Sequence, residues 1–271
     1  MKEKPIGVFD SGVGGLTVVK QLQEYLPNED IIYFGDAARV PYGTKSHDVI
    51  RHYSVQDATF LVEQGVKCIV VACNTASAHG IRDIRNRFPD IPVIGMIESG
   101  AAYAVQQSKS KHIAVIGTSA TISSDLYATH LSLLDEQVVS YSKACPLFVP
   151  LVEEALSLGQ VAESVVHHYL NGFIIPAVDT LILGCTHYPL LREVIQNYVG
   201  PSVYLVDSGK AAATYLKNCL NEQNLLRQKE NRGDLHCYLS CVTPNFEKIA
   251  SMCLKHEIEK LDLVDIEKIK I

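Results

Sequence analysis

Short apolar runs alternate with amphipathic helical patterns along most of this 271-residue chain. This alternation predicts an α/β fold with mainly parallel sheets, because each helix carries the chain back to the start of the next parallel strand. Valine and isoleucine dominate the runs, which is typical of strands covered on both faces. The expected strands are Ile6–Phe9, Ile31–Phe34, Cys68–Ala72, Val93–Met96, Ile113–Ile116, Val138–Tyr141, Leu181–Leu183, Val203–Val206 and Leu235–Ser240.

The first eight strands form two similar series. The segment Ile6–Gly12 can be laid over Ile113–Ser119, and Val70–Thr75 over Ile182–His187. Similarity this short also arises by chance between strand–turn–helix units, so duplication is a hypothesis at this point. It predicts two similar three-layer α/β domains in a pseudo-twofold arrangement, with an active-site cleft between them. The predicted domains are residues 1–97 with 208–271, and residues 98–207.

Outside the strands, local signals predict several further segments. Leu16–Leu26 carries apolar residues on one stripe at helical spacing and predicts a helix. The polar stretch Asn221–Asp234 predicts an exposed connection, after which the chain returns to the first domain. A helix is expected to begin near Thr243, with that hydroxyl as its cap and Pro244 at its first position. Residues 260–271 fit either a helix or an edge strand.

Charge and composition exclude several classes of partner. Twenty-four basic and 30 acidic residues give a net charge of −6, and no basic run exceeds a pair. A nucleic-acid partner needs a concentrated basic surface, so none is expected. The amino end lacks a signal-peptide core, and no apolar stretch has the length of about eighteen residues that a membrane span needs. We therefore expect a cytoplasmic protein with a small polar substrate or a protein partner.

The eight cysteines are expected to be free thiols, because disulfides are rare in the cytoplasm. No CxxC pair is present. Cys237 and Cys241 lack a clear second pair of ligands, so no metal is expected.

The segment Asp10–Gly15 lies directly between a strand and a helix. It is either a tight turn that needs glycine or a loop whose amides hold an anion. The spacing fits neither the P-loop nor the dinucleotide fingerprint. Asp10 follows the carboxyl end of a strand, which is where open α/β sheets bind ligands.

Two of the cysteines are candidates for catalysis. Cys73 and Cys185 each follow an apolar strand and precede an expected helix, whose N-terminus can lower a thiol's pKa from about 8.5. His187 could help to deprotonate Cys185, and Asp10 could serve Cys73 from the adjacent strand. A lone buried cysteine is more often a packing residue. That reading is expected for Cys68, Cys145, Cys219, Cys237, Cys241 and Cys253.

Five segments together resemble those of the glutamate racemases, cofactor-independent isomerases that supply D-glutamate for peptidoglycan and hence for cell-wall biogenesis and cell shape. Aspartate racemases are similar in the two cysteine motifs but generally lack this combination. The resemblance spans Ile6 to Leu191, and its segments read IGVFDSGVGGLTV, YFGDAARVPYGTKS, VVACNTASA, CPLFVPLVEE and LILGCTHYPLL.

The resemblance implies a role for each matching position. Cys73 and Cys185 would be the two catalytic thiols, assisted on their own sides by Asp10 and His187, with Glu153 orienting His187. It also implies L- or D-glutamate as the substrate and a homodimer. The residues that would line or support the substrate site are Asp10, Ser11, Tyr42, Gly43, Asn74, Thr75, Thr118, Glu153, Thr186 and His187.

The chemistry of inversion gives the cysteine pair an independent meaning. Inverting an α-carbon needs a base on one face and an acid on the other, and a thiolate facing a thiol supplies both. Three alternatives remain at this point. They are an aspartate racemase, a cysteine hydrolase that uses Cys185 and His187, and a two-domain amino-acid-binding protein. The hydrolase leaves Cys73 without a role, and a binding protein needs neither thiol.

Overall fold

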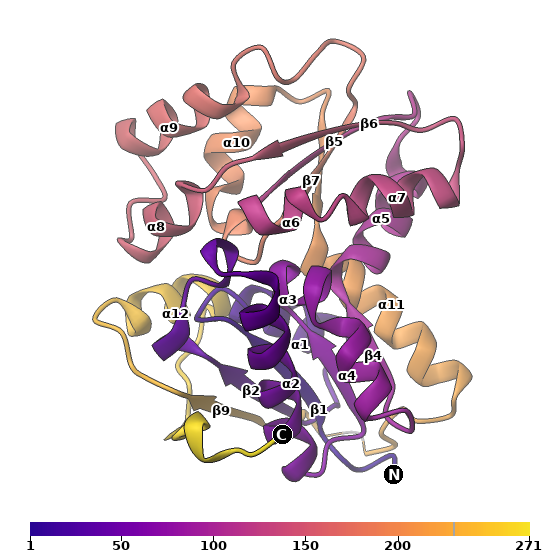
Figure 1. Cartoon of the computed structure of the whole chain (residues 1–271), viewed down its shortest axis with the longest axis vertical. Helices are drawn as coiled ribbons and strands as arrows, with labels where there is room; N and C mark the ends of the chain where they lie inside the picture. Colours follow the sequence, from indigo (N-terminus) through magenta and orange to yellow (C-terminus); the bar gives the residue numbers. More distant parts are fainter. Residues whose placement is uncertain (230) are drawn as a thin grey trace.

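A computed structural model describes residues 1–229 and 231–271. Two parallel sheets form the framework (Figure 1). The first sheet has the order β10-β9-β2-β1-β3-β4 and the second the order β6-β5-β7-β8. The strands are β1 (Ile6–Asp10), β2 (Ile31–Gly35), β3 (Cys68–Val71), β4 (Val93–Gly95), β5 (His112–Gly117), β6 (Val139–Ala144), β7 (Thr180–Gly184), β8 (Tyr204–Asp207), β9 (Leu235–Leu239) and β10 (Lys260–Leu263).

Helices connect the strands and cover the sheets. Short 3₁₀ turns are η1 (Ala37–Arg39), η2 (Tyr42–Thr44), η3 (Tyr188–Leu191) and η4 (Ile266–Lys268). The α-helices are α1 (Leu16–Tyr25), α2 (His47–Glu63), α3 (Asn74–His79), α4 (Ile81–Arg87), α5 (Met96–Gln107), α6 (Ser119–Ser123), α7 (Leu126–Leu134), α8 (Phe148–Glu153), α9 (Gln160–Leu170), α10 (Arg192–Val199), α11 (Ser208–Glu222) and α12 (Phe246–Leu254).

The two sheets repeat one topology. The order β2-β1-β3-β4 in the first sheet matches β6-β5-β7-β8 in the second, and every adjacent pair is parallel. The two sheets therefore bear out the α/β fold class and the similar architecture of the two halves. In both halves the catalytic candidate follows the third strand of its repeat, β3 or β7.

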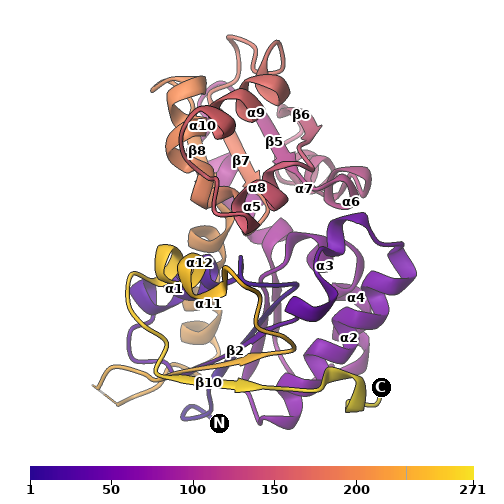
Figure 2. The same cartoon turned by 90° about the vertical axis from the view of Figure 1, so that its left-hand side faces the viewer.

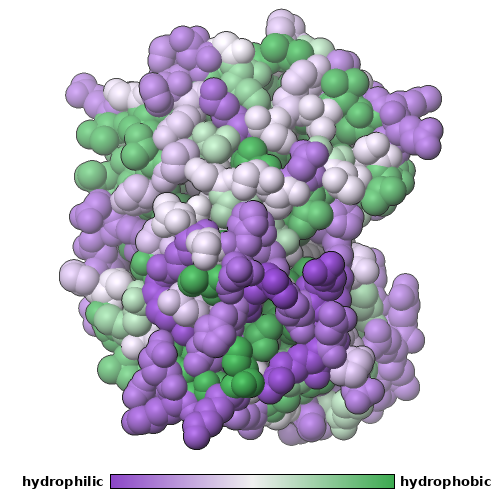
Figure 3. All heavy atoms as spheres, in the orientation of Figure 1, coloured by the Kyte–Doolittle hydropathy of each residue, from purple (hydrophilic) through white to green (hydrophobic). Residues whose placement is uncertain are grey.

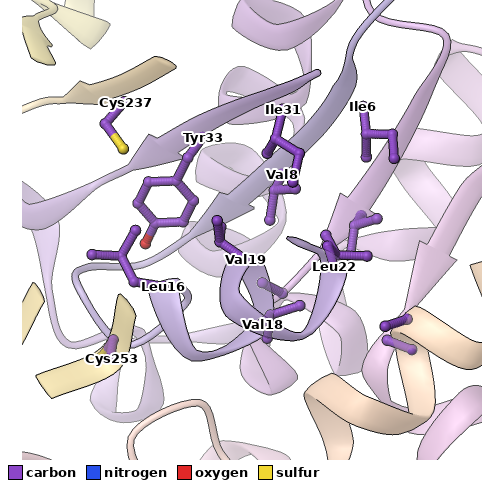
Figure 4. Packing of buried hydrophobic residues seen from close by; sticks show 14 of the residues in the cluster. Ile6, Val8, Leu16, Val18, Val19, Leu22, Ile31, Tyr33, Cys237 and Cys253 are labelled. Atoms are coloured by element: carbon purple, nitrogen blue, oxygen red, sulfur yellow. The ribbon is translucent and has the colours of Figure 1, made fainter. Parts of the chain in front are cut away.

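Alternate residues of the strands enter different cores, which makes each half three layers deep. Val8 packs with α1, whereas its neighbour Phe9 belongs to the core on the opposite face of the sheet. Figure 4 shows Val8 and Ile31 facing Val19 of α1. Cys237 also lies in this core, fully buried, while Cys241 is exposed.

Helices α5 and α11 lie where the chain crosses between the sheets, and they pack on each other (Figure 1). The predicted domain boundary at 97/98 falls within the first turn of α5. Helix α5 also packs on α7 and β7 of the second half. None of the helices in residues 1–229 and 231–271 combines the length and the apolar character that a membrane span requires.

The carboxyl-terminal region differs from expectation in its details. Residues 260–263 form β10, a parallel edge strand beside β9, and the chain ends after a short 3₁₀ turn (Figure 2). The expected helix starts two residues later than predicted, at Phe246 after Asn245. The predicted Thr243 cap is wrong, because the Thr243 carbonyl instead accepts the Phe246 amide in a turn. The predicted connection Asn221–Asp234 begins inside α11, and residue 230 lies outside the described residues.

Candidate active site

Cys73 is the N-cap residue of α3, two residues after β3 ends. Its Sγ accepts the Ala76 amide at 3.4 Å and donates to Ser11 Oγ at 3.6 Å. Burial, reinforced by the negative charge of Asp10, raises the pKa of the Cys73 thiol to about 12. This is opposite to the lowering expected from a helix N-terminus. Helix α3 has only six residues, and the cost of removing water from a thiolate outweighs the stabilisation that the helix N-terminus provides.

Cys185 follows β7 in the equivalent place of the second half. Its Sγ lies 3.8 Å from Nδ1 of His187, and Nε2 of that histidine lies 2.6 Å from Oε1 of Glu153. Burial opposes a charged imidazole, but its contacts with Cys185 and Glu153 prevail and raise the pKa of His187 well above its ordinary value. The expected α-helix beyond Cys185 is first a 3₁₀ turn, η3, with Pro189 in its first turn; α10 begins only at Arg192.

Asp10 ends β1 and is fully buried. Its Oδ2 accepts the amides of Gly12 and Gly15 at 3.2 and 2.9 Å, so those two amides are not free to hold an anion. Its Oδ1 accepts the Thr186 hydroxyl at 3.2 Å, across the junction of the two halves. Burial raises the pKa of Asp10, with the nearby positive charge of His187 opposing. No hydrogen bond joins Asp10 to Cys73 among the described residues.

The two thiols line one cavity between the halves. Its volume is about 20 Å³, enough for about one water molecule, and Cys73 and Cys185 are only 5 % and 6 % exposed. Of the residues expected around the substrate, Asp10 and Glu153 do not line this cavity, and Glu153 lines the larger cavity beside it. Val40, Pro41 and Val149 are lining residues that sequence reasoning missed, although they lie inside the quoted motifs. The other lining residues are Ser11, Tyr42, Gly43, Asn74, Thr75, Thr118, Thr186 and His187.

Asn74 presents an unused donor in this cavity. Its Oδ1 accepts the Tyr127 hydroxyl at 2.7 Å, whereas Nδ2 is the one buried side-chain nitrogen or oxygen of the described residues without a hydrogen-bond partner. A buried donor without a partner is costly, which is consistent with a ligand that completes it. Tyr127 lies in no quoted motif, so the sequence offered no signal for it.

The halves also touch each other around the cavity. Thr75 Oγ1 lies 2.9 Å from Thr118 Oγ1 of the second half. A Cβ on Gly43 would lie 2.7 Å from that of Thr118, so only glycine permits this approach of the turn. A larger cavity of about 490 Å³ adjoins the small one and shares Val40, Gly43 and Val149 with it.

This geometry can move protons on two sides of one small molecule. Each half contributes a thiol from the end of a strand, and the polar side chains between them can hold a zwitterion. Cys185, His187 and Glu153 are arranged like a nucleophile, a base and the carboxylate that orients the base. The geometry on the Cys185 side is therefore compatible with the hydrolase alternative. The second thiol in the same cavity is what a hydrolase does not require.

Comparison with known proteins gives the class. The model of the Asp/Glu/hydantoin racemase family matches residues 6–216. This chain belongs to that family of isomerases.

Its relatives narrow the class to the glutamate racemases. The chain is 47 % identical to the glutamate racemase of Aquifex aeolicus, over 94 % of this chain and 95 % of the relative. The structure of the Francisella tularensis glutamate racemase in complex with D-glutamate matches with a TM-score of 0.91 at 40 % identity, covering 98 % and 99 % of the two chains. The Escherichia coli glutamate racemase, in complex with L-glutamate and the activator UDP-MurNAc-Ala, matches with a TM-score of 0.76 at 26 % identity, covering 96 % and 98 %.

Proposed function

We propose that this protein interconverts L- and D-glutamate, with Cys73 and Cys185 as the two acid–base groups. The observation that carries the proposal is the pair of buried thiols, one from the equivalent strand end of each half, in a single cavity. Relatives of this chain bind D-glutamate and L-glutamate in their solved structures. Glutamate is favoured over aspartate because the nearly full-length relatives are glutamate racemases.

In the proposed reaction, one thiolate removes the α-proton and the opposite thiol delivers a proton to the other face. Cys73 acts as base on D-glutamate and Cys185 on L-glutamate, as the family resemblance implies. Asp10 and His187 assist the thiols of their respective sides. The reverse reaction exchanges the roles of the two thiols, so neither direction leaves a proton unaccounted for.

Two features of the cavity support proton removal without a pyridoxal ring. Burial raises the pKa of Cys73 to about 12, and the α-ammonium of the substrate would lower it by attraction to the thiolate. Donors in the cavity can bear the charge that develops on the α-carboxylate, and Asn74 Nδ2 is available for it. No added cofactor is therefore required in this proposal.

The cavity of about 20 Å³ is far smaller than an amino acid, so the two halves must separate to admit substrate. We propose the domains 1–97 with 208–271, and 98–207, moving about α5 and α11. These two helices are where the chain passes from one sheet to the other.

We further propose a cytoplasmic homodimer that supplies D-glutamate for cell-wall synthesis. Exposed apolar side chains support self-association, because contiguous apolar surface marks contact sites. They gather at the left edge of the upper half, over α8 and α9 (Figure 3). The exposed side chains there are Leu147, Leu156, Leu158 and Val161. Sedimentation of the purified protein measures the assembly.

The direct test is to incubate pure protein with L-glutamate and to follow optical rotation. Rotation should decay to zero, because the free enantiomers have equal energy. In D₂O the product from either enantiomer should carry deuterium at Cα. Cys73→Ala and Cys185→Ala should each reduce turnover in both directions by about 10²- to 10⁴-fold, the range for an acid–base group. Turnover that survives loss of either thiol would contradict the two-base assignment.

A further inference from the structure

A buried polar cluster lies beneath the turn that carries Tyr42 and Gly43. It joins Asp36 after β2, Arg39 of η1 and Asp57 of α2 to the Tyr42 hydroxyl. Asp36 and Asp57 are both fully buried, and Arg39 is 8 % exposed. The cluster lies outside the catalytic cavity, and the reaction proposed above does not use its carboxyl groups.

One cation faces two carboxyl groups in this cluster. Arg39 Nε donates to Asp36 Oδ2 at 2.6 Å, and its Nη2 donates to Asp57 Oδ1 at 3.0 Å. A single guanidinium cannot neutralise two buried carboxylates, and an uncompensated buried charge is costly. The other titratable groups that bear on the cluster add no positive charge that compensates it. They are Asp10 near Asp57, Glu267 of η4 at 3.5 Å from Arg39, Tyr53 beneath the guanidinium, and Lys45, whose Nζ lies 6.0 Å from the Tyr53 ring and makes no ion pair with the cluster among the described residues.

The two hydrogen bonds between Tyr42 and the carboxyl groups need two protons. A phenol and two carboxylates together have only one, on the phenol. The Tyr42 hydroxyl contacts Asp57 Oδ2 at 2.8 Å and also contacts Asp36 Oδ2. It has one proton, whereas ionised carboxylates only accept. One of the two contacts therefore needs a proton on a carboxyl oxygen.

The surroundings of the two carboxyls decide which one holds that proton. Both oxygens of Asp36 already accept, from Arg39 Nε and from the Ser240 hydroxyl at 2.9 Å. Asp57 Oδ2 has the Tyr42 hydroxyl as its one hydrogen-bond partner among the described residues. A proton on Asp57 Oδ2 satisfies every group, because Asp57 then donates to Tyr42 and Tyr42 donates to Asp36.

We infer that Asp57 is a neutral carboxylic acid in the folded protein and that it positions the Tyr42–Thr44 turn through this proton chain. Asp36 and Arg39 then form a neutral pair. The turn supplies Tyr42 and Gly43 to the wall of the active-site cavity. The link to catalysis rests on the proposed function, whereas the protonation of Asp57 does not.

The direction of titration agrees with the geometry. Burial, followed by the negative charge of Asp36, raises the pKa of Asp57 well above its ordinary value. An aspartate in the unfolded chain loses its proton near pH 4. Between that pH and the raised pKa, the folded protein binds a proton that the unfolded chain does not. The contribution of Asp57 to the unfolding free energy is therefore present at low pH and falls as pH rises above about 4.

Infrared difference spectroscopy tests the protonation directly. Spectra of protein labelled with carbon-13 at the aspartate carboxyl are recorded at neutral pH for the wild type, Asp57→Asn and Ser240→Ala, which removes the hydroxyl that donates to Asp36 Oδ1. We expect the C=O band of a protonated acid to be lost in Asp57→Asn and to keep its frequency in Ser240→Ala, because the carbonyl oxygen of protonated Asp57 accepts from Arg39 and not from Ser240. Other buried carboxyls, such as Asp10, contribute equally to all three spectra. A band that shifts in Ser240→Ala, which would place the proton on Asp36, or a band that persists in Asp57→Asn would overturn the inference.

Stability and a third variant complete the test. Asparagine replaces a neutral acid at 57 conservatively, so Asp57→Asn should stay within a few degrees of the wild-type Tm. If Asp57→Asn does not fold, Tyr42→Phe serves, since it removes the acceptor and should shift the acid band. An unshifted band in Tyr42→Phe would overturn the chain. These readouts need no turnover, so failure of the racemase proposal is seen separately, by optical rotation.

Discussion

The two thiols proposed as catalytic have different immediate neighbours, although their backbones occupy equivalent places in the two halves. Cys73 contacts the Ser11 hydroxyl and a helix amide, whereas Cys185 faces an imidazole held by Glu153. An imidazole can exchange a proton with its thiol, while a serine hydroxyl is a much weaker base. Proton transfer on the two sides should therefore respond differently to mutation.

Replacing the assistants should expose this difference. His187→Asn should slow the proton transfers of the Cys185 side more, and Asp10→Asn those of the Cys73 side, with some activity retained in both. The overall equilibrium stays at one, so the bias must appear in kcat and KM separately or in isotope effects. Deuterium isotope effects in each direction provide the measurement. Identical isotope-effect profiles for the two variants would contradict the assignment of one assistant to each side.

Gly14 is a second residue whose surroundings predict a loss of activity on substitution. A Cβ at Gly14 would lie 2.6 Å from His187 Nδ1 and 2.6 Å from Thr186 Oγ1. Gly14→Ala should displace the imidazole from Cys185 and lower kcat by about 10²-fold or more, the lower end for a lost acid–base group. Steady-state kinetics in both directions measure the change.

Gly172→Ala is the control for Gly14→Ala. Gly172 has φ +70 and no atom within 4 Å of an added Cβ. An alanine there strains the turn by about 1 kcal/mol without touching the site. It should lower stability and leave kcat intact. Equal kcat values for the two variants would count against the steric argument at Gly14.

At the scale of elements, the sequence predicted most of the fold because the strands are buried on both faces. Every residue of β1 and β3 is buried, so these strands appear in the sequence as continuous apolar runs such as Ile6–Phe9, which are easy to recognise. The start of α12 was misplaced, because Thr243 and Pro244 are good helix-start residues that here form the preceding turn. Edge strand β10 was undecided, since its side chains are exposed on a strand with a single neighbour.

Only part of the candidate site could be predicted from the sequence. Residues directly after strands, such as Cys73 and Cys185, could be predicted because topology brings strand ends together. Tyr127 and Asn245 could not, because they reach the site from elements that meet only after the halves pack. The raised pKa of Cys73 was also missed, since burial of its surroundings is a property of the closed molecule.

Asn245 gives a prediction about the junction of α8 with the segment before α12. Its Nδ2 donates to the main-chain oxygen of Glu153 at 2.9 Å, and Glu153 holds His187. Asn245→Ala should lose about 1 kcal/mol of this support, which is about a fivefold fall in kcat. Thr243→Ala is the control for the local fold and should leave the Tm unchanged, since Thr243 does not cap α12. An unchanged kcat in Asn245→Ala would remove the proposed support.

For the whole molecule, the repeated topology of the two halves explains why a single cavity receives two similar thiols. The strand order of one half is repeated in the other, and each half places the cysteine that comes after its third strand at the junction (Figure 1). A reaction that must treat both faces of one carbon benefits from two walls of similar chemistry. The cost is access, because walls close enough to reach one small carbon leave no path for the substrate while they are closed.

Thiol alkylation should reveal the opening that such a molecule requires. Cys73 and Cys68 are both buried thiols whose pKa is about 12, so their reactivity toward iodoacetamide differs through access rather than through thiolate content. Opening of the halves exposes Cys73 but leaves Cys68 inside the first core. In the free protein, mass spectrometry should therefore find Cys73 modified well before Cys68. Saturating D-glutamate should slow modification of Cys73 and Cys185, while the exposed Cys241 reacts at an unchanged rate. Equal rates for Cys73 and Cys68 would mean that the halves stay closed, and substrate would then need another route to the thiols.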